Sequence, residues 1–329
     1  MKETDIRDDK YAEKIKYYAT EDKKVLMKHE KDFVKVSCPA CGKLDASFAF
    51  IKLRIQYLEC NNCRTIYASP RPTPEILKEY YQKSKNYQFW NKYVFPTSEK
   101  ARREKIFKPR VDLLIKYCKL SGIKSGTLIE VGAGFGTFCE EVKSRNFFKR
   151  VIGIEPIPDL AESCRKKGIE IIEKPVEEVN LKSIKADVIA SFETLEHLFN
   201  PRDFILSCSK LLKKGGLLVL SCPNMFGFDT LVLREMSKSV GGEHINMFNP
   251  ESIKILMQDC GLVALDVKTP GKLDAELVHK AIIIDNFNMD DQYFLKHLLV
   301  DRWDDMGDKF QKFLSDNLLS SHMFSVAKK

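Results

Sequence analysis

The stretch EVGAGFG, residues 130–136, decides the fold of this chain. It follows an apolar run, Thr127-Leu128-Ile129, and precedes a segment with helical periodicity. An acidic residue followed by three glycines at alternate positions is typical of a strand that passes through a tight loop into a helix. Glycine is needed because such a loop turns sharply and lets a ligand approach bare backbone. An ordinary glycine turn is the alternative, so the stretch needs support from its surroundings.

The sequence around this stretch alternates between strands and helices. Such alternation predicts an α/β fold with a parallel sheet covered on both faces, and with ligands outside the carboxyl ends of the strands. The segment at about 270–320 would be a helical insertion that could cover the substrate as a lid. We expect strands at 127–131, 151–155, 169–173, 186–192, 216–221, 262–268 and 322–328, and helices at 74–93, 98–120, 136–145, 157–167, 201–213 and 250–260.

Two further motifs follow the glycine loop. VIGIEP, residues 151–156, puts Glu155 at the end of the second strand, where a carboxylate can accept hydrogen bonds from both hydroxyls of a ribose. A surface glutamate at a strand end is the alternative. SFETLEHLFNP, residues 191–201, follows the strand at 186–192. Nicotinamide-binding folds share the first two features, but their glycines run G-x-G-x-x-G. The spacing G-x-G-x-G suits a cofactor that has no pyrophosphate to seat on the helix start.

With these three motifs, residues 126–268 resemble the class I S-adenosylmethionine (SAM) methyltransferases, in the branch with E-x-G-x-G-x-G and L-E-H-L-x-[DN]-P. The resemblance implies a Rossmann-like seven-stranded methyltransferase sheet and SAM as the cofactor. It also implies that Glu155 holds the ribose. Other implied cofactor contacts are the methionine-binding loop of Glu130, Gly132, Ala133, Gly134 and Gly136, the adenine neighbours Pro156 and Val176, and Phe192 and Glu193 near the methyl donor.

The histidines are candidates for acid–base chemistry. The methyl group of SAM is already activated, so a protein mainly aligns the acceptor, and needs a base only for a hydroxyl or an acidic carbon. His197 lies in the loop after the strand at 186–192 and is either that base or a structural hydrogen-bonder. His244, in a glycine-rich loop at 241–248, should reach over the cleft. Glu243 could orient His244 as a general base, or the pair could clamp the loop.

Four cysteines near the N-terminus have the spacing C-x2-C-x18-C-x2-C. Each pair can hold a metal from a tight turn, and four thiolates complete the tetrahedron that zinc prefers. A small module with little core gains folding energy in this way. A redox pair and four unligated thiols are the alternatives. We therefore expect structural zinc at Cys38, Cys41, Cys60 and Cys63.

These motifs divide the chain into four expected parts. They are an N-terminal helical extension at 1–35, a zinc ribbon at 36–70, a helical connector or cap at 71–125 and a SAM-binding methyltransferase domain at 126–329. No apolar run approaches the roughly 20 residues of a membrane span. The first residues also lack the apolar stretch of a secretion signal. We expect a cytoplasmic protein with reduced cysteines.

The charge is concentrated in the first 110 residues, which hold 25 lysines and arginines against 15 acidic residues, whereas the whole chain has a net charge of +8. A basic face attracts phosphate-bearing partners such as a nucleotide-linked substrate or RNA. A basic surface that serves only solubility is the alternative.

A zinc ribbon ahead of a methyltransferase resembles two groups, deoxysugar C-methyltransferases with their glycan-modifying relatives, and certain ribosomal-RNA methyltransferases. The C-methyltransferases carry a long C-terminal domain, but only about sixty residues follow position 268. Base-amine methyltransferases show N-P-P-Y or D-P-P-Y where this chain has Phe192-Glu193-Thr194-Leu195. We therefore expect a small or sugar-linked acceptor that is methylated at oxygen and that could carry a phosphate handle. An RNA methyltransferase and a SAM-binding module without turnover remain alternatives.

Overall fold

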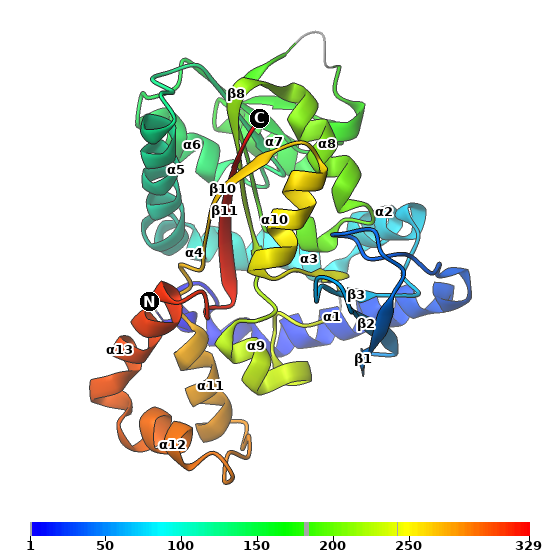
Figure 1. Ribbon diagram of the computed structural model, residues 1–329, viewed down its shortest axis with the longest axis vertical. Coiled ribbons are helices and arrows are strands. Elements are labelled where there is room, and N and C mark those ends of the chain that lie inside the picture. The colour runs from blue at the N-terminus through cyan, green and yellow to red at the C-terminus, as the bar shows by residue number, and fades with distance from the viewer. Residues whose placement is uncertain (1, 181–183, 242) are drawn as a thin grey trace.

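A seven-stranded sheet forms the centre of the molecule in the computed structural model, which describes residues 2–180, 184–241 and 243–329 (Figure 1). Gly242, in the expected glycine-rich loop, lies outside the described residues. The strand order is β10-β11-β8-β7-β4-β5-β6. The strands are β4 (Thr127–Val131), β5 (Arg150–Ile154), β6 (Glu170–Ile172), β7 (Ala186–Phe192), β8 (Leu212–Pro223), β10 (Val263–Lys268) and β11 (His322–Lys328).

The sequence predicted all seven strands, but the sheet is mixed and not wholly parallel. β4 to β8 pair in parallel, whereas β11 pairs antiparallel with both β8 and β10. The direction reverses because the chain returns from a helical segment and β11 enters the sheet between β8 and β10. The result is an α/β Rossmann-like sheet with an antiparallel edge.

Successive residues of the central strands feed two cores on opposite faces. Leu128 packs with one core and Ile129 with the other, as the two-residue period of a strand requires. One face is covered by α5 (Lys108–Leu120), α6 (Thr137–Ser144) and α7 (Pro158–Lys166), and the other by α8 (Pro201–Leu211) and α10 (Pro250–Asp259).

The helices before the sheet are more broken than the sequence indicated. The helix expected at 74–93 is split at Ser84 into α2 (Pro74–Lys83), α3 (Lys85–Phe89) and a π-helical turn. The Ser84 hydroxyl donates to the buried Asp22, at 2.6 Å, and accepts from the Tyr87 amide, so it caps α3. The helix expected at 98–120 starts earlier, as α4 (Phe95–Arg102), and passes through a π-helical turn into α5. Asp22 belongs to α1 (Ala12–Leu26).

A second sheet joins the cysteine-rich segment to the rest of the chain. Its strands are β1 (Ala46–Lys52), β2 (Ile55–Cys60), β3 (Ile66–Ala68) and β9 (Asn246–Met247). β9 comes almost 180 residues after β3 and begins two residues after His244. The cysteine-rich segment is therefore fixed to the methyltransferase-like part by backbone hydrogen bonds.

The expected insertion forms a helical lobe, seen together with α9 on one side of Figure 1. Its helices are α11 (Asp274–Ile283), α12 (Tyr293–Lys296) and α13 (Trp303–Asp316), and the earlier helix α9 (Phe228–Leu233) packs against α11. Within residues 2–180, 184–241 and 243–329, no helix combines the length and the apolar composition that crossing a bilayer needs.

Candidate active site

A cavity of about 1210 Å³ opens at the carboxyl ends of β4, β5, β7 and β8. Every candidate cofactor residue except Gly136 lines it, as do His197, Glu243 and His244. Gly136 lies behind the loop, where an added Cβ would come within 2.4 Å of Ile169. Its φ of 71° lets it stand at the start of α6. Gly136 therefore shapes the loop without facing the cavity. The lining candidates are Glu130, Gly132, Ala133, Gly134, Glu155, Pro156, Val176, Phe192 and Glu193.

Backbone amides fix Glu155 from two sides. Its Oε2 accepts from the Gly134 amide at 2.8 Å, and its Oε1 accepts from the Ile157 amide at 3.0 Å. Burial raises the pKa of Glu155, and these two amides counteract that effect. Gly134 has a φ of 54°, and no atom lies within 4 Å of the position that a Cβ would take. The loop thus leaves open space on its cavity side.

Glu130 is buried at the end of β4. Its Oε2 accepts a hydrogen bond from the Cys139 thiol at 3.0 Å, and burial raises its pKa to about 8. A carboxyl group with this pKa holds its proton at neutral pH. A cation placed beside it would favour ionisation.

Glu193, at the end of β7, has a φ of 51°, which is strained for a residue with a side chain. Its Oε1 lies 3.0 Å from Arg110, 3.4 Å from His322 and 2.6 Å from the Ser221 hydroxyl. Desolvation would raise the pKa of Glu193, but His322, Arg110 and the Ser221 hydroxyl lower it to about 2. The sequence did not single out these three partners. The pairing of adjacent strand ends, which brings Ser221 beside Phe192 and His322 beside Pro223, is the signal that could have found them.

Both candidate histidines are oriented by backbone carbonyls. His197 Nδ1 lies 3.1 Å from the Glu243 carbonyl oxygen, and His244 Nδ1 lies 2.8 Å from that of Ser239. Since a carbonyl only accepts, each Nδ1 carries a proton, and in the neutral ring that makes this contact the lone pair lies on Nε2. The rings lie 4.8 Å apart. Burial, followed by the nearby His244, lowers the pKa of His197 to about 4, so this ring is neutral at physiological pH.

The expected pairing of Glu243 with His244 is not what these hydrogen bonds show. The Glu243 backbone carbonyl orients His197, while His244 is held by Ser239. Local sequence suggested adjacent partners, but the loop folds so that Glu243 contacts the neighbouring loop.

Glu196 is a residue that the sequence analysis missed. It is buried, and its Oε2 has no hydrogen-bond partner among the described residues. One of its carboxylate oxygens lies within 4.8 Å of a ring nitrogen of His197 and of a ring nitrogen of His244. The three side chains could share a proton or a cation.

The cysteine-rich segment fixes the loops that carry these histidines. The Ala68 amide donates to the Ile245 carbonyl at 2.9 Å, and the Tyr57 hydroxyl donates to the His244 carbonyl at 3.3 Å. The buried Arg71 donates to the Asn246 side chain at 2.9 Å, and Asn246 in turn donates to the Leu198 carbonyl at 2.7 Å. Both histidine loops are therefore tied to strands β2 and β3 and to the segment that follows them.

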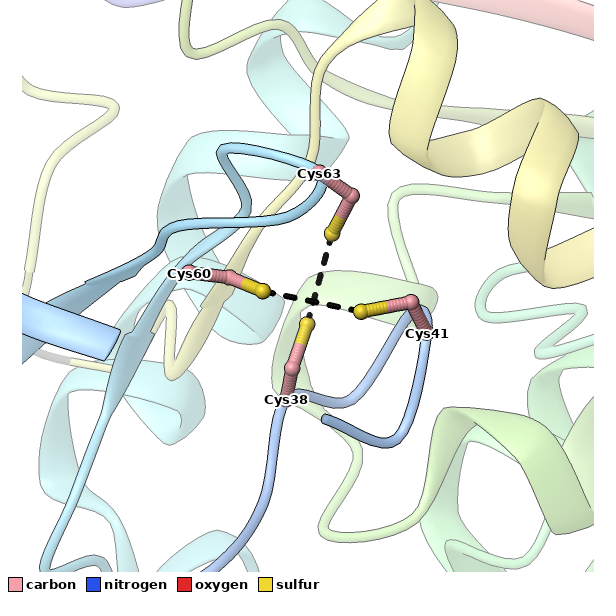
Figure 2. Close-up of side chains that lie close together, drawn as sticks. All are labelled: Cys38, Cys41, Cys60 and Cys63. Atoms are coloured by element: carbon pink, nitrogen blue, oxygen red, sulfur yellow. Dashed lines mark hydrogen bonds between the residues drawn. The ribbon is translucent and has the colours of Figure 1, made fainter. Parts of the chain in front are cut away.

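The four candidate zinc ligands converge on one point (Figure 2). The sulfur atoms of Cys38 and Cys63 lie 3.5 Å apart, as do those of Cys41 and Cys60. Zinc–sulfur bonds of about 2.3 Å in a tetrahedron separate sulfur atoms by about 3.8 Å, so the arrangement fits a zinc ion with little adjustment. None of the four cysteines forms a disulfide.

The two cysteine turns have the same construction. The Gly42 amide donates to the Cys38 carbonyl, and the Arg64 amide donates to the Cys60 carbonyl in the equivalent place. Gly42 and Arg64 both have positive φ, 72° and 58°. Backbone amides also point at the sulfur atoms of Cys38 and Cys60 and would stabilise thiolates there. The donor set and its amide surroundings suit a metal that prefers thiolate ligands.

Comparisons with known proteins agree with this geometry. The profile of the family described as "Methyltransferase domain" matches residues 99–267, just over half of the 329-residue chain. A probable S-adenosylmethionine-dependent methyltransferase of Mycobacterium tuberculosis (strain CDC 1551 / Oshkosh) is 26% identical over 125 residues, which cover 37% of this chain and 44% of that protein. The ubiquinone biosynthesis O-methyltransferase of Caulobacter vibrioides is 28% identical over 129 residues, 38% of this chain and 49% of that protein.

Solved structures share less sequence identity with this chain than these two relatives do. The crystal structure of a SAM-dependent methyltransferase from Archaeoglobus fulgidus aligns with a TM-score of 0.49 and 22% identity, over 72% of this chain and all of that one. The chain spans less than half the length of the two curated relatives, so their full activities do not transfer to it. The family match nevertheless spans the glycine loop and the strand ends that line the cavity: the chain belongs to the family of methyltransferase domains.

Proposed function

We propose that this protein transfers the methyl group of SAM to a hydroxyl oxygen of a small or glycan- or nucleotide-linked acceptor. One observation carries the proposal: two histidines, each held at Nδ1 by a backbone carbonyl, line the same cavity as the cofactor loop. Ligand pockets commonly measure about 300–1,000 Å³. The cavity, at about 1210 Å³, has room for a cofactor and a second molecule together.

Each cavity residue has a proposed role in holding SAM. Glu155, with both oxygens fixed by amides, would accept hydrogen bonds from the ribose hydroxyls. Gly132, Ala133 and Gly134 would line the methionine portion, with Glu130 close enough to favour its positive charges. Pro156 and Val176 would flank the adenine, and Phe192 and Glu193 would lie near the sulfonium. Gly136 would support the loop from behind.

In the proposed reaction the acceptor oxygen attacks the methyl carbon in line with the carbon–sulfur bond. The carbon–oxygen bond forms as the carbon–sulfur bond breaks, and the products are the methyl ether and S-adenosylhomocysteine. His244 Nε2 would take the hydroxyl proton, since the Ser239 carbonyl holds its ring with the lone pair on Nε2. His197, whose pKa is about 4, would accept a hydrogen bond from the acceptor without becoming charged. Glu243 would contribute by orienting His197.

We assign zinc a structural role at Cys38, Cys41, Cys60 and Cys63. The site lies in the segment at 36–70 and does not line the cavity. Bound zinc would stabilise the two cysteine turns and, through β3, the loop that carries His244. In this proposal the extension at 1–35 and the helices at 71–125 close the cavity of the domain at 126–329.

Oxygen is the proposed target for two reasons. The histidine pair supplies the base that a hydroxyl needs and an amine needs less. The curated relatives include ubiquinone biosynthesis O-methyltransferases from several organisms, whose matched parts are 27% to 30% identical to this chain. No observation in the cavity favours RNA over a small acceptor.

The test is methyl transfer from labelled SAM into a cell extract, followed by mass spectrometry of the products. The expected result is label in a low-mass or glycan-linked product, as a methyl ether that survives treatment with mild acid. Label confined to the RNA fraction, with an affinity that falls steeply as salt rises, would favour the RNA alternative. SAM binding without label in any fraction, in single-turnover conditions, would indicate a binding module.

A further inference from the structure

Two arginines that the proposed function leaves without a role meet at Trp90, in the lining of the cavity. Arg7 comes from the N-terminal segment and Arg102 from the last residue of α4, and both line the cavity. Their guanidinium carbons lie 5.8 Å and 5.9 Å from the centroid of the Trp90 ring. Arg102 also lies 4.7 Å from the centroid of Phe95. Two like charges thus share one aromatic wall.

Arg102 has no carboxylate partner among the described residues. Its Nε donates to the Ser98 hydroxyl at 2.9 Å, and its Nη2 donates to the Ile6 carbonyl at 2.9 Å. Burial, followed by the charges of Arg7 and Arg110, lowers the pKa of Arg102 to about 10. The next residue, Arg103, is different, because it pairs with three carboxylates, those of Glu99, Glu140 and Glu141.

Arg7 is also incompletely paired. Its Nε is buried without a hydrogen-bond partner, and its Nη1 lies 3.4 Å from Glu3. Glu3 is shared with Lys238 at 2.6 Å and with Lys280 at 3.6 Å, and Lys280 also lies 3.5 Å from Glu276, so two carboxylates face these three cations and Arg102. This part of the cavity therefore carries more positive than negative charge.

A partly buried guanidinium without an anion is costly, and two side by side repel each other. A planar guanidinium binds carboxylate and phosphate through paired hydrogen bonds, which are strong where aromatic rings exclude water. We propose that Arg102 and Arg7 bind the anionic group, a carboxylate or a phosphate, of a molecule held in this cavity. That group has two candidate sources, the methionine carboxylate of SAM and an acidic group on the acceptor. Naming these sources rests on the proposed function, but the anion site itself does not.

Tryptophan fluorescence can test the site without turnover. The chain has two tryptophans, Trp90 and Trp303, and Trp303 stacks on His279 in the helical lobe at 4.2 Å. A Trp303→Phe protein leaves Trp90 as the reporter for titration with inorganic phosphate. We expect saturable quenching, with an affinity that falls about ten- to hundredfold in Arg102→Gln and in Arg7→Gln. Arg103→Gln, the matched control, should keep the wild-type affinity.

Two further arms identify the source of the anion. If the site holds the cofactor carboxylate, S-adenosylhomocysteine will block phosphate binding, and Arg102→Gln will weaken S-adenosylhomocysteine but not 5′-methylthioadenosine, which lacks the carboxylate. If it holds an acceptor group, phosphate will bind equally well to protein saturated with S-adenosylhomocysteine, and Arg102→Gln will leave the affinity for that nucleoside unchanged.

Absence of phosphate binding to the wild type, or equal affinity in wild type, Arg102→Gln and Arg7→Gln, would overturn the site. Thermal unfolding of each variant separates these outcomes from misfolding, and Arg102→Lys, which keeps the charge but loses the fork, should fall between wild type and Arg102→Gln. Intact phosphate binding in a protein that methylates no hydroxyl would reject the proposed reaction and leave the anion site standing.

Discussion

At the scale of single residues, two environments determine what the cavity can do. His197 and His244 have their Nδ1 protons committed to backbone carbonyls, which leaves their Nε2 lone pairs available to a ligand. Glu130 and Glu193 lie at the carboxyl ends of the neighbouring strands β4 and β7. Burial raises the pKa of Glu130 to about 8, whereas His322, Arg110 and Ser221 hold the pKa of Glu193 at about 2. Neighbours, not residue type, set these protonation states.

Replacing His244 should separate chemistry from cofactor binding. If its Nε2 takes the acceptor proton, His244→Ala will lower kcat about 10²- to 10⁴-fold, while the Kd for SAM changes less than about threefold. Added imidazole should restore part of the rate, because it replaces a base but not a loop contact. His279→Ala, in the helical lobe, is the control. Unchanged turnover in His244→Ala would remove the assignment.

Glu130 predicts that SAM binding depends on pH. The free carboxyl has a pKa of about 8, and the ammonium and sulfonium of SAM favour its ionised form, so binding releases a proton. Affinity should therefore rise as pH increases toward 8, by at most about tenfold per unit, and then level off. Calorimetry in buffers with different ionisation enthalpies will show up to one proton released at pH 7, and none in Glu130→Gln. An affinity that is flat between pH 6 and 8 would contradict this.

At the scale of elements, the short strand β9 has an effect beyond its two residues. It pairs with β3 of the cysteine-rich segment and begins two residues after His244. The Asn249 side chain then caps α10, because its Oδ1 accepts from the Glu251 amide at 3.0 Å and from the Ser252 amide at 2.9 Å. The loop of His244 is thus held at its end by a strand pair and a helix cap. A disturbance of the cysteine turns should reach this loop first.

Loss of zinc should therefore impair turnover more than cofactor binding. We expect one zinc per chain by elemental analysis, and Cys60→Ser should lose the metal and lower kcat at least about tenfold, because β3 no longer positions β9. Binding of S-adenosylhomocysteine should weaken less than about threefold, since the glycine loop belongs to the other sheet. Cys118→Ala, in α5, is the control for removal of a buried thiol. Intact folding and activity in a protein free of zinc would refute the site.

At the scale of the whole molecule, the N-terminal segment holds separate parts of the cavity wall together. Glu3 pairs with Lys238, which follows β8 in the chain, and with Lys280 in α11. Asp5 pairs with Lys105, in the turn that follows α4. Burial would raise the pKa of Glu3, but Lys238, Arg7 and Lys280 lower it overall. This contribution to stability is present above the unfolded pKa of about 4.5 and is lost as the pH falls through the lower, folded value.

Neutralising Glu3 should loosen the helical lobe. In Glu3→Gln, amide hydrogen exchange of α11 (Asp274–Ile283) should become faster, while the central strands β4 and β7 stay protected. The free energy of unfolding should fall by about 1 kcal/mol at pH 7 and by less near pH 3, where the wild-type carboxylate is partly protonated. Glu13→Gln, exposed on α1, should change neither quantity. Equal exchange in both variants would show that the segment does not support the lobe.

The sequence by itself determined the seven strands, the glycine loop and the four converging cysteines, whereas the antiparallel place of β11 in the sheet did not follow from it. Strand periodicity is local, and the motifs at 130–136, 151–156 and 191–201 follow strands that parallel pairing must bring to one edge. The cysteine spacing is equally local, since each pair forms its own turn. All of these depend on neighbours within a few residues or on pairing between strands of known type.

Only the tertiary structure decided the surroundings of the site. Arg7 and Arg102 meet at Trp90, Glu243 orients His197 and not His244, and Arg71 connects the cysteine-rich segment to Asn246. The break at Ser84 likewise depends on Asp22, 62 residues away in the chain. Such contacts arise from packing between distant segments, and no local pattern encodes which polar partners meet there. The physical reason is that protonation states and ligand preference depend on burial and on which charged groups lie close together, and both arise only when the chain folds.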